Sequence, residues 1–343
     1  MMTDYLGGYT AEWEVRLVDP ETWDDAGVVE GVRSVSVDRG CPDGAPLLES
    51  GSMAIDSDGS RVEGRWCRIS MKAEQGGTDR TAMATLLFER ASSRVEKGTA
   101  EVTYDGHSVL KPAADRRMPY GAYAPEGCDG AAYAAGLLAE CTPAPVRVEG
   151  SFTLVDDVVF DIGCTYLEAV WKVLQAAGWC IQIDGRGEIA VRAKPTEPAL
   201  ELSSQTAALL LPGVDDDFSL ADVPNTYYAI DDSRSAVAVN DDPSSPVSTV
   251  SRGRSVDVVD TSPVLVDGES IEMYAARKLA EASIVTRTLT YEREFWPGVV
   301  PYSLVRASLP EHGVEGDLRV SAQTLECGRG VNVTESAQME VYA

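Results

Sequence analysis

Histidine and basic residues are scarce in this sequence. The chain of 343 residues has two histidines, His107 and His312, and its 29 lysines and arginines stand against 55 aspartates and glutamates, a formal net charge of −26. Such an acidic balance excludes a basic nucleic-acid-binding surface of the usual kind. Two interpretations of the charge stay open. It keeps a large assembly soluble, or it lets DNA pass without being held, because a like-charged wall repels phosphates.

Long apolar runs are absent too. The start of the chain, from Met1 to Tyr5, lacks the basic stretch and the apolar run of a signal peptide. No stretch approaches the roughly 20 apolar residues that are needed to span a bilayer. We therefore expect no membrane segment, and a chain that is made and kept in a cytoplasm. Its hydrophobic content of 44% suffices for several domains with cores of their own.

Cysteine motifs are missing as well. The seven cysteines are widely spread and none forms a C-x-x-C pair, which argues against a zinc ribbon or a redox motif. Cys164 and Cys180 flank a predicted helix and would lie about 24 Å apart along it, given the rise of a straight helix. That distance is too long for a disulfide. We expect buried free thiols, which fit a reducing compartment.

No catalytic signature is present either. His107 and His312 each sit beside turn residues, without a serine or cysteine nucleophile motif and without an H-E-x-x-H pattern. No G-x-S-x-G, P-loop or G-x-G-x-x-G lies between a strand and a helix, and the G-R-G segment at 185–187 is a turn. We therefore predict no catalytic residue and no cofactor-binding residue.

Two acidic segments resemble metal sites only in part. The D-S-D-G segment at 56–59 begins like a calcium loop but lacks the later ligand positions and the closing glutamate, so a plain turn is the better interpretation. The D-D-D run at 215–217 would either hold a cation or link two domains, and we favour the linker. We predict no metal-binding residue and no cofactor.

Residues 1–111 predict a first antiparallel β-barrel. Trp13, Val15 and Leu17 alternate with charged residues, which is the period-2 pattern of a half-buried strand. About six or seven short strands of this kind are typical of a barrel or a sandwich. The clearest strands are expected around 12–17, 34–37, 66–71, 81–90 and 99–104, the last closed by an Asp-Gly turn at 105–106.

Residues 112–213 predict a small α/β domain in the middle of the chain. A helix begins at Thr165, which forms a capping box with Glu168, and it ends at Gly178. The hairpin 179–192 follows at once and buries the helix. Because every local signal agrees here, we expect this helix-and-hairpin unit to be well formed and to separate two β-rich arms.

Residues 214–343 predict a second antiparallel β-barrel. A helix with an apolar inner face is expected at 269–283. The strands after this helix either complete the second barrel or return to the middle domain. Strands are expected at 225–230, 235–239, 247–259, 285–294, 302–309, 318–327 and 332–342. The fold class is therefore α+β and mainly β, with two antiparallel β-barrel domains separated by a small α/β domain that contains the helix and the hairpin.

Three stretches of the chain carry a resemblance to a known family. They are 47–56 with 64–69, 119–123 with 165–192, and 270–282 with 286–291 and the closing strands. In this organisation the chain resembles the hub family at the tip of phage tails. The family includes the baseplate hub of contractile-tailed phages and the amino-terminal part of siphophage tail-associated lysins, and the base of type VI secretion spike proteins is a further relative. The resemblance covers nearly the whole chain.

The resemblance implies a structural function and a set of partners. In the family, two similar barrels per subunit assemble as a trimer into a ring of pseudo-sixfold symmetry, with the middle domain beneath it. We accordingly expect a homotrimeric tail-tip hub, encoded by a phage or prophage, that joins the tail tube to a spike or fibre around a central channel. Its expected partners are further copies of itself, the distal tail or tail-tube protein, the tape-measure protein, and the spike or fibre protein.

The same resemblance implies a place and the absence of an activity. The hub would be assembled in the cytoplasm of a bacterial host and reside at the virion tail tip, where DNA passes without specific binding. The sequence ends at Ala343, directly after the second arm, with no peptidase or glycosidase domain behind it. We therefore expect no enzyme.

Two other functions stay open. A carbohydrate-binding or host-adhesion module would use exposed aromatic side chains such as Trp296, which lies in a Trp-Pro-Gly turn. A cell-wall hydrolase would use a pair of carboxylates, but 55 acidic residues offer many pairs and single out none.

Overall fold

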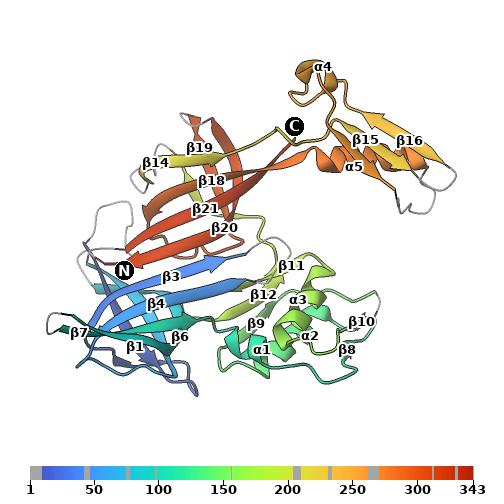
Figure 1. The fold of residues 1–343 in the computed structure, drawn as a ribbon. Helices are drawn as coiled ribbons and strands as arrows, with labels where there is room; N and C mark the ends of the chain where they lie inside the picture. The colour runs from blue at the N-terminus through green and yellow to red at the C-terminus, as the bar shows by residue number, and fades with distance from the viewer. Residues whose placement is uncertain are drawn as a thin grey trace. The chain divides into compact units, whose positions relative to one another are not determined.

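Strands make up most of the structure, a computed structural model that describes residues 10–41, 47–74, 78–96, 99–155, 157–203, 210–230, 234–261, 270–310, 313–328 and 331–342 (Figure 1). With 51% of the chain in strands and 15% in helices, the predicted α+β, mainly β class is confirmed. Among the described helices, none combines the length and the apolar character that a membrane span requires.

One large sheet of 13 strands organises the chain. Its strands are β1 (Thr10–Val18), β2 (Asp25–Val28), β3 (Val32–Gly40), β4 (Leu48–Asp56), β5 (Arg65–Glu74), β6 (Thr78–Glu96), β7 (Thr99–His107), β13 (Pro198–Leu202), β14 (Leu210–Asp217), β18 (Ile284–Glu294), β19 (Leu304–Leu309), β20 (Val314–Cys327) and β21 (Val331–Tyr342). The main path runs β14, β18, β21, β20, β3, β4, β7, β6, β5, β1 and β2, while β13 pairs with β19 and β19 with β20. The described pairings of this sheet are antiparallel apart from the parallel pair β13 and β19.

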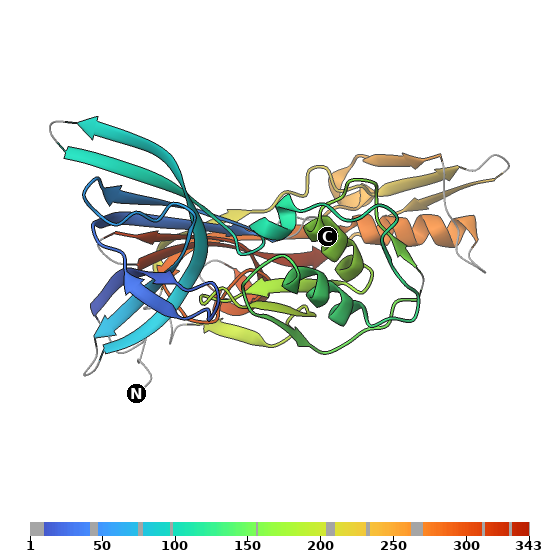
Figure 2. The same cartoon turned by 90° about the horizontal axis from the view of Figure 1, so that it is seen from below.

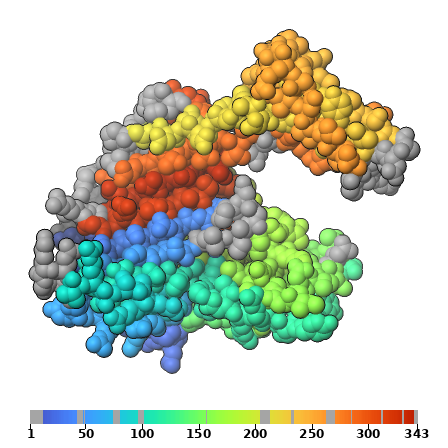
Figure 3. All heavy atoms as spheres, in the orientation of Figure 1, coloured from blue at the N-terminus to red at the C-terminus, as the bar shows by residue number. Residues whose placement is uncertain are grey.

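The first and last parts of the chain share this sheet, because β20 pairs with β3. Leu325 lies opposite Val37, and both side chains are buried in one core. Figure 3 shows the red atoms of the C-terminal strands directly beside the blue atoms of the N-terminal strands. The two closed barrels that we predict are not observed among the described strands. Alternation specifies which face of a strand is buried, but not which strand lies beside it.

The chain folds into two compact units. The larger unit comprises Met1–Val214 and Thr290–Ala337, and the smaller unit comprises Asp215–Leu289 and Gln338–Ala343. The boundaries between them fall inside β14, β18 and β21, so these three strands run from one unit into the other.

Two glycines make room in the core of the large sheet. Gly51 on β4 lies opposite Gly106 on β7. A Cβ atom on Gly51 would lie 2.6 Å from Leu86 Cδ1, and one on Gly106 would lie 2.9 Å from the same atom. The side chain of Leu86 therefore occupies the space that both glycines leave open. The predicted turn at 105–106 is wrong, because Gly106 is required by packing within a strand and β7 continues through it to His107.

Short helices and strands fill residues 111–193 of the larger unit. They are α1 (Lys111–Asp115), β8 (Tyr123–Ala124), α2 (Gly130–Ala139), β9 (Val146–Glu149), β10 (Val158–Val159), α3 (Tyr166–Gln175), β11 (Trp179–Ile183) and β12 (Ile189–Ala193). β12 pairs antiparallel with β11 and parallel with β9. Figure 2 shows α2 and α3, in green, side by side.

The predicted helix-and-hairpin unit is confirmed. At the start of α3 the Glu168 backbone N–H donates to Thr165 Oγ1 over 3.1 Å, and the Thr165 N–H donates to Glu168 Oε2 over 2.6 Å. Gly178 takes the left-handed conformation at φ +66°, and β11 begins at the next residue. Val170 and Leu174 on the inner face of α3 are fully buried.

The smaller unit contains a separate three-stranded sheet. Its elements are β15 (Thr226–Ile230), β16 (Ser235–Val239), α4 (Thr249–Arg252), β17 (Asp257–Asp260) and α5 (Ile271–Ala282). The strand order is β16, β15, β17, and α5 covers one face, where its Ile271 and Leu279 share a core with Tyr227 and Ala229.

One strand prediction for this part of the chain is wrong. The segment 247–259 is not one strand, because Ser248 caps α4 by accepting from the Ser251 N–H and Gly253 ends it at φ +60°. The acidic run 215–217 is the end of strand β14, and the boundary between the two compact units falls directly before it, between Val214 and Asp215. Within the run, Asp216 accepts from Arg287 Nε over 3.0 Å and from Arg287 Nη2 over 2.7 Å.

Candidate interaction surfaces

The tip of the β11–β12 hairpin is held by side chains of the first strands. The Gly185 carbonyl oxygen accepts from Thr85 Oγ1 over 3.1 Å. The Arg186 carbonyl oxygen accepts from Trp23 Nε1 over 2.8 Å and from Arg68 Nη2 over 3.1 Å. Both carbonyl groups face away from the hairpin's own ladder, so a turn that would ordinarily be solvated is instead docked on the large sheet.

Arg68 is the centre of this contact. Only 2% of its surface is exposed, yet its guanidinium donates to Asp25 Oδ1 over 2.6 Å, to Thr85 Oγ1 over 3.2 Å and to the Trp23 carbonyl oxygen over 3.1 Å. Burial lowers the pKa of Arg68, and the nearby Asp25 carboxylate opposes this shift. A buried cation with this many acceptors holds neighbouring backbone segments together and is closed to a ligand.

Backbone contact at the hairpin tip requires glycine. A Cβ atom on Gly185 would lie 2.0 Å from the Ala82 carbonyl oxygen, which no side chain tolerates. Gly187 takes φ +77°, and a Cβ atom there would also lie 2.8 Å from Thr85 Cβ. The G-R-G turn predicted from the sequence is therefore both a turn and the surface that joins the helix-and-hairpin unit to the large sheet.

A second buried polar cluster lies at the centre of the C-terminal strands. Glu335 on β21 is fully buried and accepts from Tyr291 Oη, from Arg293 Nη2 and from Gln323 Nε2 over 2.5, 2.6 and 2.6 Å. Burial raises the pKa of Tyr291 well above its ordinary value, and the Glu335 carboxylate adds to the shift. Because all four side chains are at most 3% exposed, this cluster stabilises the sheet and offers no approach to a substrate.

A third buried pair joins β3 and β4. Arg39 Nε lies 2.7 Å from Glu49 Oε1, and their side chains are 2% and 1% exposed. Ser108 Oγ donates to Glu49 Oε2 over 3.4 Å. Burial raises the pKa of Glu49, and the Arg39 guanidinium works against that shift.

The solvent-exposed face of the large sheet carries a continuous row of acidic and hydroxyl side chains, which we term the acidic row. It crosses five neighbouring strands, β20, β3, β4, β7 and β6, through Glu326, Ser36, Ser52, Asp105 and Glu89, each opposite the next. The three carboxylates are exposed and the two serines half-buried. The row therefore presents negative charge and small hydroxyl groups, with no lysine or arginine among its members.

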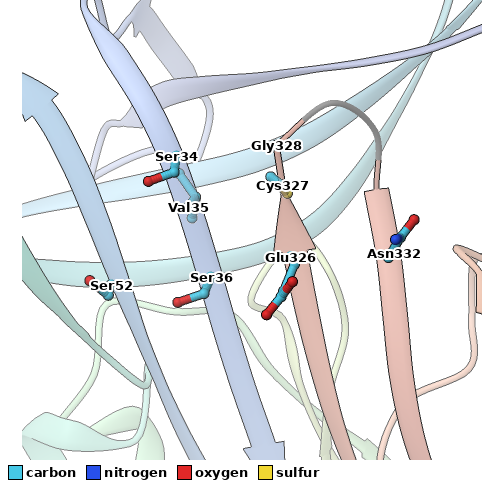
Figure 4. A pocket seen from close by; sticks show the side chains of 8 residues that line it. All are labelled: Ser34, Val35, Ser36, Ser52, Glu326, Cys327, Gly328 and Asn332. Atoms are coloured by element: carbon cyan, nitrogen blue, oxygen red, sulfur yellow. The ribbon is translucent and has the colours of Figure 1, made fainter. Parts of the chain in front are cut away.

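The next row on the same face continues this character. Asp38 lies opposite Thr324 on one side and Ser50 on the other, and Thr324 Oγ1 donates to Asp38 Oδ1 over 2.7 Å. A hollow of about 520 Å³ adjoins the acidic row, and Ser36, Ser52 and Glu326 are among the residues that line it. Figure 4 shows these three side chains on neighbouring strands.

The side chains that the sequence singled out do not come together in one site. His107 ends β7, with Nε2 3.6 Å from Glu89 Oε2, and His312 lies outside the described residues. Asp56 is the last residue of β4 and forms an ion pair with Arg33, and the residues after it form the predicted turn. Within the described ranges, histidine, cysteine and acidic side chains nowhere gather in a group of three that could hold a metal ion.

Trp296 is less exposed than a sugar-binding platform requires. Its ring is half-buried and packs against the core of the large sheet. It lines a hollow of about 330 Å³ together with Pro198, Ala199, Leu200 and Glu201.

All seven cysteines are free thiols. Cys67, Cys180 and Cys327 are buried, and burial raises the pKa of each thiol to about 12. These three groups stay protonated and unreactive at neutral pH. The predicted absence of a Cys164–Cys180 disulfide is confirmed.

No protein-family model matches this sequence, and no curated protein matches it. Solved structures do match its fold. The tail protein from Neisseria meningitidis MC58 matches with a TM-score of 0.62 at 16% identity, covering 96% of this chain and 97% of that chain. The 43 kDa tail protein of prophage MuSo2 from Shewanella oneidensis matches with a TM-score of 0.61 at 11% identity, covering 95% and 98%. A chain of the Francisella PdpA–VgrG complex matches with a TM-score of 0.57 at 8% identity, covering 98% of this chain and 59% of that chain.

These matches extend over nearly the whole of this chain and comprise a tail protein, a prophage tail protein and a chain of a VgrG complex. The resemblance to the tail-hub family that the sequence predicts is therefore confirmed at the level of the fold.

Proposed function

We propose that this chain is a structural, non-enzymatic subunit of a phage or prophage tail tip, a homotrimeric hub that joins the tail tube to a spike or fibre. The observation that carries the proposal is the fold likeness over the full length of two tail proteins, of which the chain covers 97% and 98%. Such agreement in extent as well as in fold favours the same kind of structural part rather than a shared module within an unrelated protein.

The polar chemistry of the larger unit supports a structural function. Arg68, Arg293 and Glu335 are buried charged groups of this unit, and each is engaged by protein partners at hydrogen-bond distance. An active site instead keeps a perturbed group within reach of a substrate. We infer that this chain carries no catalytic, cofactor-binding or metal-binding residue.

The acidic row supports a channel function. A row of carboxylates and hydroxyl groups with no basic side chain among its members repels phosphates at short range, so a polyanion slides past it without a stable contact. We propose that the large-sheet face bearing Glu326, Asp105 and Glu89 lines the central channel of the trimer, through which DNA and the tape-measure protein pass.

In this proposal the three predicted parts of the chain have different tasks. Residues 1–111 and 214–343 build the ring, and residues 112–213 hang beneath it as a spacer and docking element. The docked hairpin tip supports a fixed, rather than hinged, attachment of that middle part. The remaining partners are the distal tail or tail-tube protein above the ring and the spike or fibre protein below it.

Electron microscopy of tail particles tests the proposal. Particles induced from a strain that carries the gene with a small epitope tag would be labelled with antibody and imaged. We expect label at the tail tip and three copies of this fold around a channel in the averaged density. Label along the tube or none on the particle, or a single copy at the tip, would contradict the hub.

The alternative of a carbohydrate-binding or host-adhesion module has less support, since Trp296 is packed against the core. Binding of the purified chain to host cells, abolished by a Trp296→Ala substitution, would favour it over the hub. A cell-wall hydrolase would clear host cell walls, and we expect no clearing.

A further inference from the structure

The sheet of the smaller unit carries apolar side chains on both of its faces. Its covered face, beneath α5, carries Tyr227 together with the small residues Ala229, Ala236 and Ala238. Its opposite face carries Val237, Val239 and Val259, which are 53%, 50% and 57% exposed. A sheet with one solvated face ordinarily places large apolar residues inward and polar residues outward.

The strand register places these exposed side chains together. Tyr228 on β15 lies opposite Val237 on β16 and opposite Val259 on β17, so the three form one row across the whole sheet. Val239 stands beside the row, opposite Thr226, and Ile230 stands on its other side, opposite Ser235. We call the five side chains Tyr228, Ile230, Val237, Val239 and Val259 the outer face.

The outer face is free of charge within a strongly acidic unit. Residues 215–289 contain 14 aspartates and glutamates and 6 lysines and arginines, a net charge of −8. The charged member of the neighbouring row is Asp257, at the margin opposite Thr226. A contiguous exposed patch of apolar side chains with a polar margin is typical of a surface that another protein covers.

We propose that the outer face binds a second copy of this chain, the neighbouring subunit of the tail-tip assembly. The inference rests on the proposed function and names the surface that brings subunits together. Each copy carries a net charge of −26, so two copies can touch closely only where like charges are absent. A basic partner, in contrast, would bind to an acidic surface of the chain and not to this uncharged face.

The small area of the outer face limits the affinity between two copies of the chain. A stable interface buries about 800 Å² per partner, from roughly 20–30 residues on each side. Five side chains supply a fraction of that area. The contact therefore holds neighbours in place within an assembled ring and associates weakly between chains in dilute solution.

Photo-cross-linking of the full-length protein tests the proposal. p-Benzoylphenylalanine replaces Val237 in one version and Val95, an equally non-core valine that is 76% exposed in the larger unit, in the control version. Both are irradiated as concentrated purified protein and within tail particles. We expect a product of two chains from position 237 in both settings, and markedly less from position 95. A cross-link inside one chain, or only to a different protein, overturns the proposal.

A charge substitution provides the second measurement. Val237→Asp should weaken association in sedimentation experiments at high concentration by about tenfold, while Val95→Asp leaves it unchanged. Equal association of the Val237→Asp variant and wild type overturns the proposal, provided that the variant has the wild-type circular dichroism spectrum. If the tagged chain is found at the tail tip and yet Val237→Asp assembles as wild type does, this inference fails alone; if the chain is absent from tails, the proposed function fails.

Discussion

Gly185 at the tip of the β11–β12 hairpin lies against the backbone of Ala82 in β6, so closely that a Cβ atom on Gly185 would stand 2.0 Å from the Ala82 carbonyl oxygen. This contact joins the helix-and-hairpin unit to the large sheet through main chain alone. A side chain at position 185 must push the hairpin away and separate its tip from Thr85, Trp23 and Arg68.

Gly185→Ala should therefore destabilise the protein strongly. We expect a loss of about 2–4 kcal/mol in the free energy of unfolding, because the contact is with backbone that cannot move aside. Urea denaturation followed by tryptophan fluorescence measures it. The matched control is Gly136→Ala on the exposed side of α2, where a Cβ atom meets nothing within 4 Å and helix propensity raises stability by about 0.5–1 kcal/mol. Equal behaviour of the two variants would refute the close contact.

Arg68→Met tests the side-chain hydrogen bonds that hold the same hairpin tip on the large sheet. The substitution keeps the side chain's length but removes donors to Asp25 and to the Arg186 carbonyl oxygen. We expect a cost of about 2–3 kcal/mol, because Asp25 is 25% exposed and can recruit water. The exposed pair of Arg306 and Asp317 offers a control: Arg306→Met should change stability little.

The two changes should also be non-additive. Once Gly185→Ala has lifted the hairpin tip, Arg68 no longer reaches Arg186, so the double variant should lose less than the sum of the two single losses. Strict additivity would mean that the two residues act in separate contacts.

Local elements of this fold are predictable from sequence. The capping box of Thr165 and Glu168, the left-handed Gly178 and the hairpin behind it were each correct, because each depends on residues within a few positions of one another. The resemblance to the tail-hub family rests on the order of such elements, and the fold comparison supports it at the level of the fold.

Long-range pairings were not predictable. The alternation around Arg68 indicates that Cys67 and Ile69 point to a core and that Arg68 points to solvent, yet the structure buries all three. The reason is that the hairpin tip, more than 100 residues away in sequence, covers the second face of β5. Nothing in the sequence indicates that β20 pairs with β3. The sequence therefore predicts two separate β-rich arms, although these two strands are neighbours in one sheet.

The segment 247–259 failed for a different reason. Valines at 247, 250, 256, 258 and 259 favour a strand. The short polar cap at Ser248 and the left-handed Gly253 outweigh them locally, since the caps satisfy backbone donors that a strand would leave to a partner.

Alkaline pH should destabilise the fold of the smaller unit. Tyr227 and Tyr274 donate to the same oxygen of Asp260, over 3.2 and 2.7 Å, and burial together with Asp260 raises the pKa of Tyr227 from 10.0 to about 12. In the unfolded chain this phenol loses its proton first. The stability it contributes is therefore complete below pH 10 and is lost as the pH rises through about 12.

Tyrosine absorbance near 295 nm and circular dichroism, recorded together across this range, check the expectation. Tyr227→Phe should remove one late-ionising phenol and flatten the fall in stability above pH 10. Tyr120→Phe, at a side chain that is 88% exposed, should leave the stability profile unchanged. A Tyr227→Phe protein with the wild-type alkaline profile would count against the shared Asp260 contact.

The last prediction concerns DNA binding at the acidic row. If this face lets DNA pass because it repels phosphates, then adding cations to it should create binding. Ser36→Lys with Ser52→Lys places two lysines among Glu326, Asp105 and Glu89 without entering the core, since both serines lie on the solvent side of their strands.

We expect no detectable binding of duplex DNA by the wild-type chain and weak binding by this double variant, with an affinity that falls steeply as salt is raised, because two phosphate contacts release counterions. Fluorescence anisotropy with a labelled duplex over a salt series measures both the affinity and its dependence on salt. A control with two lysines at Ser57 and Ser151, two exposed positions that lie outside the strands of the large sheet, separates the effect of position from that of net charge. In phage carrying the double variant, DNA ejection should slow relative to wild type and to the control. Equal ejection rates in all three would place the acidic row away from the path of DNA.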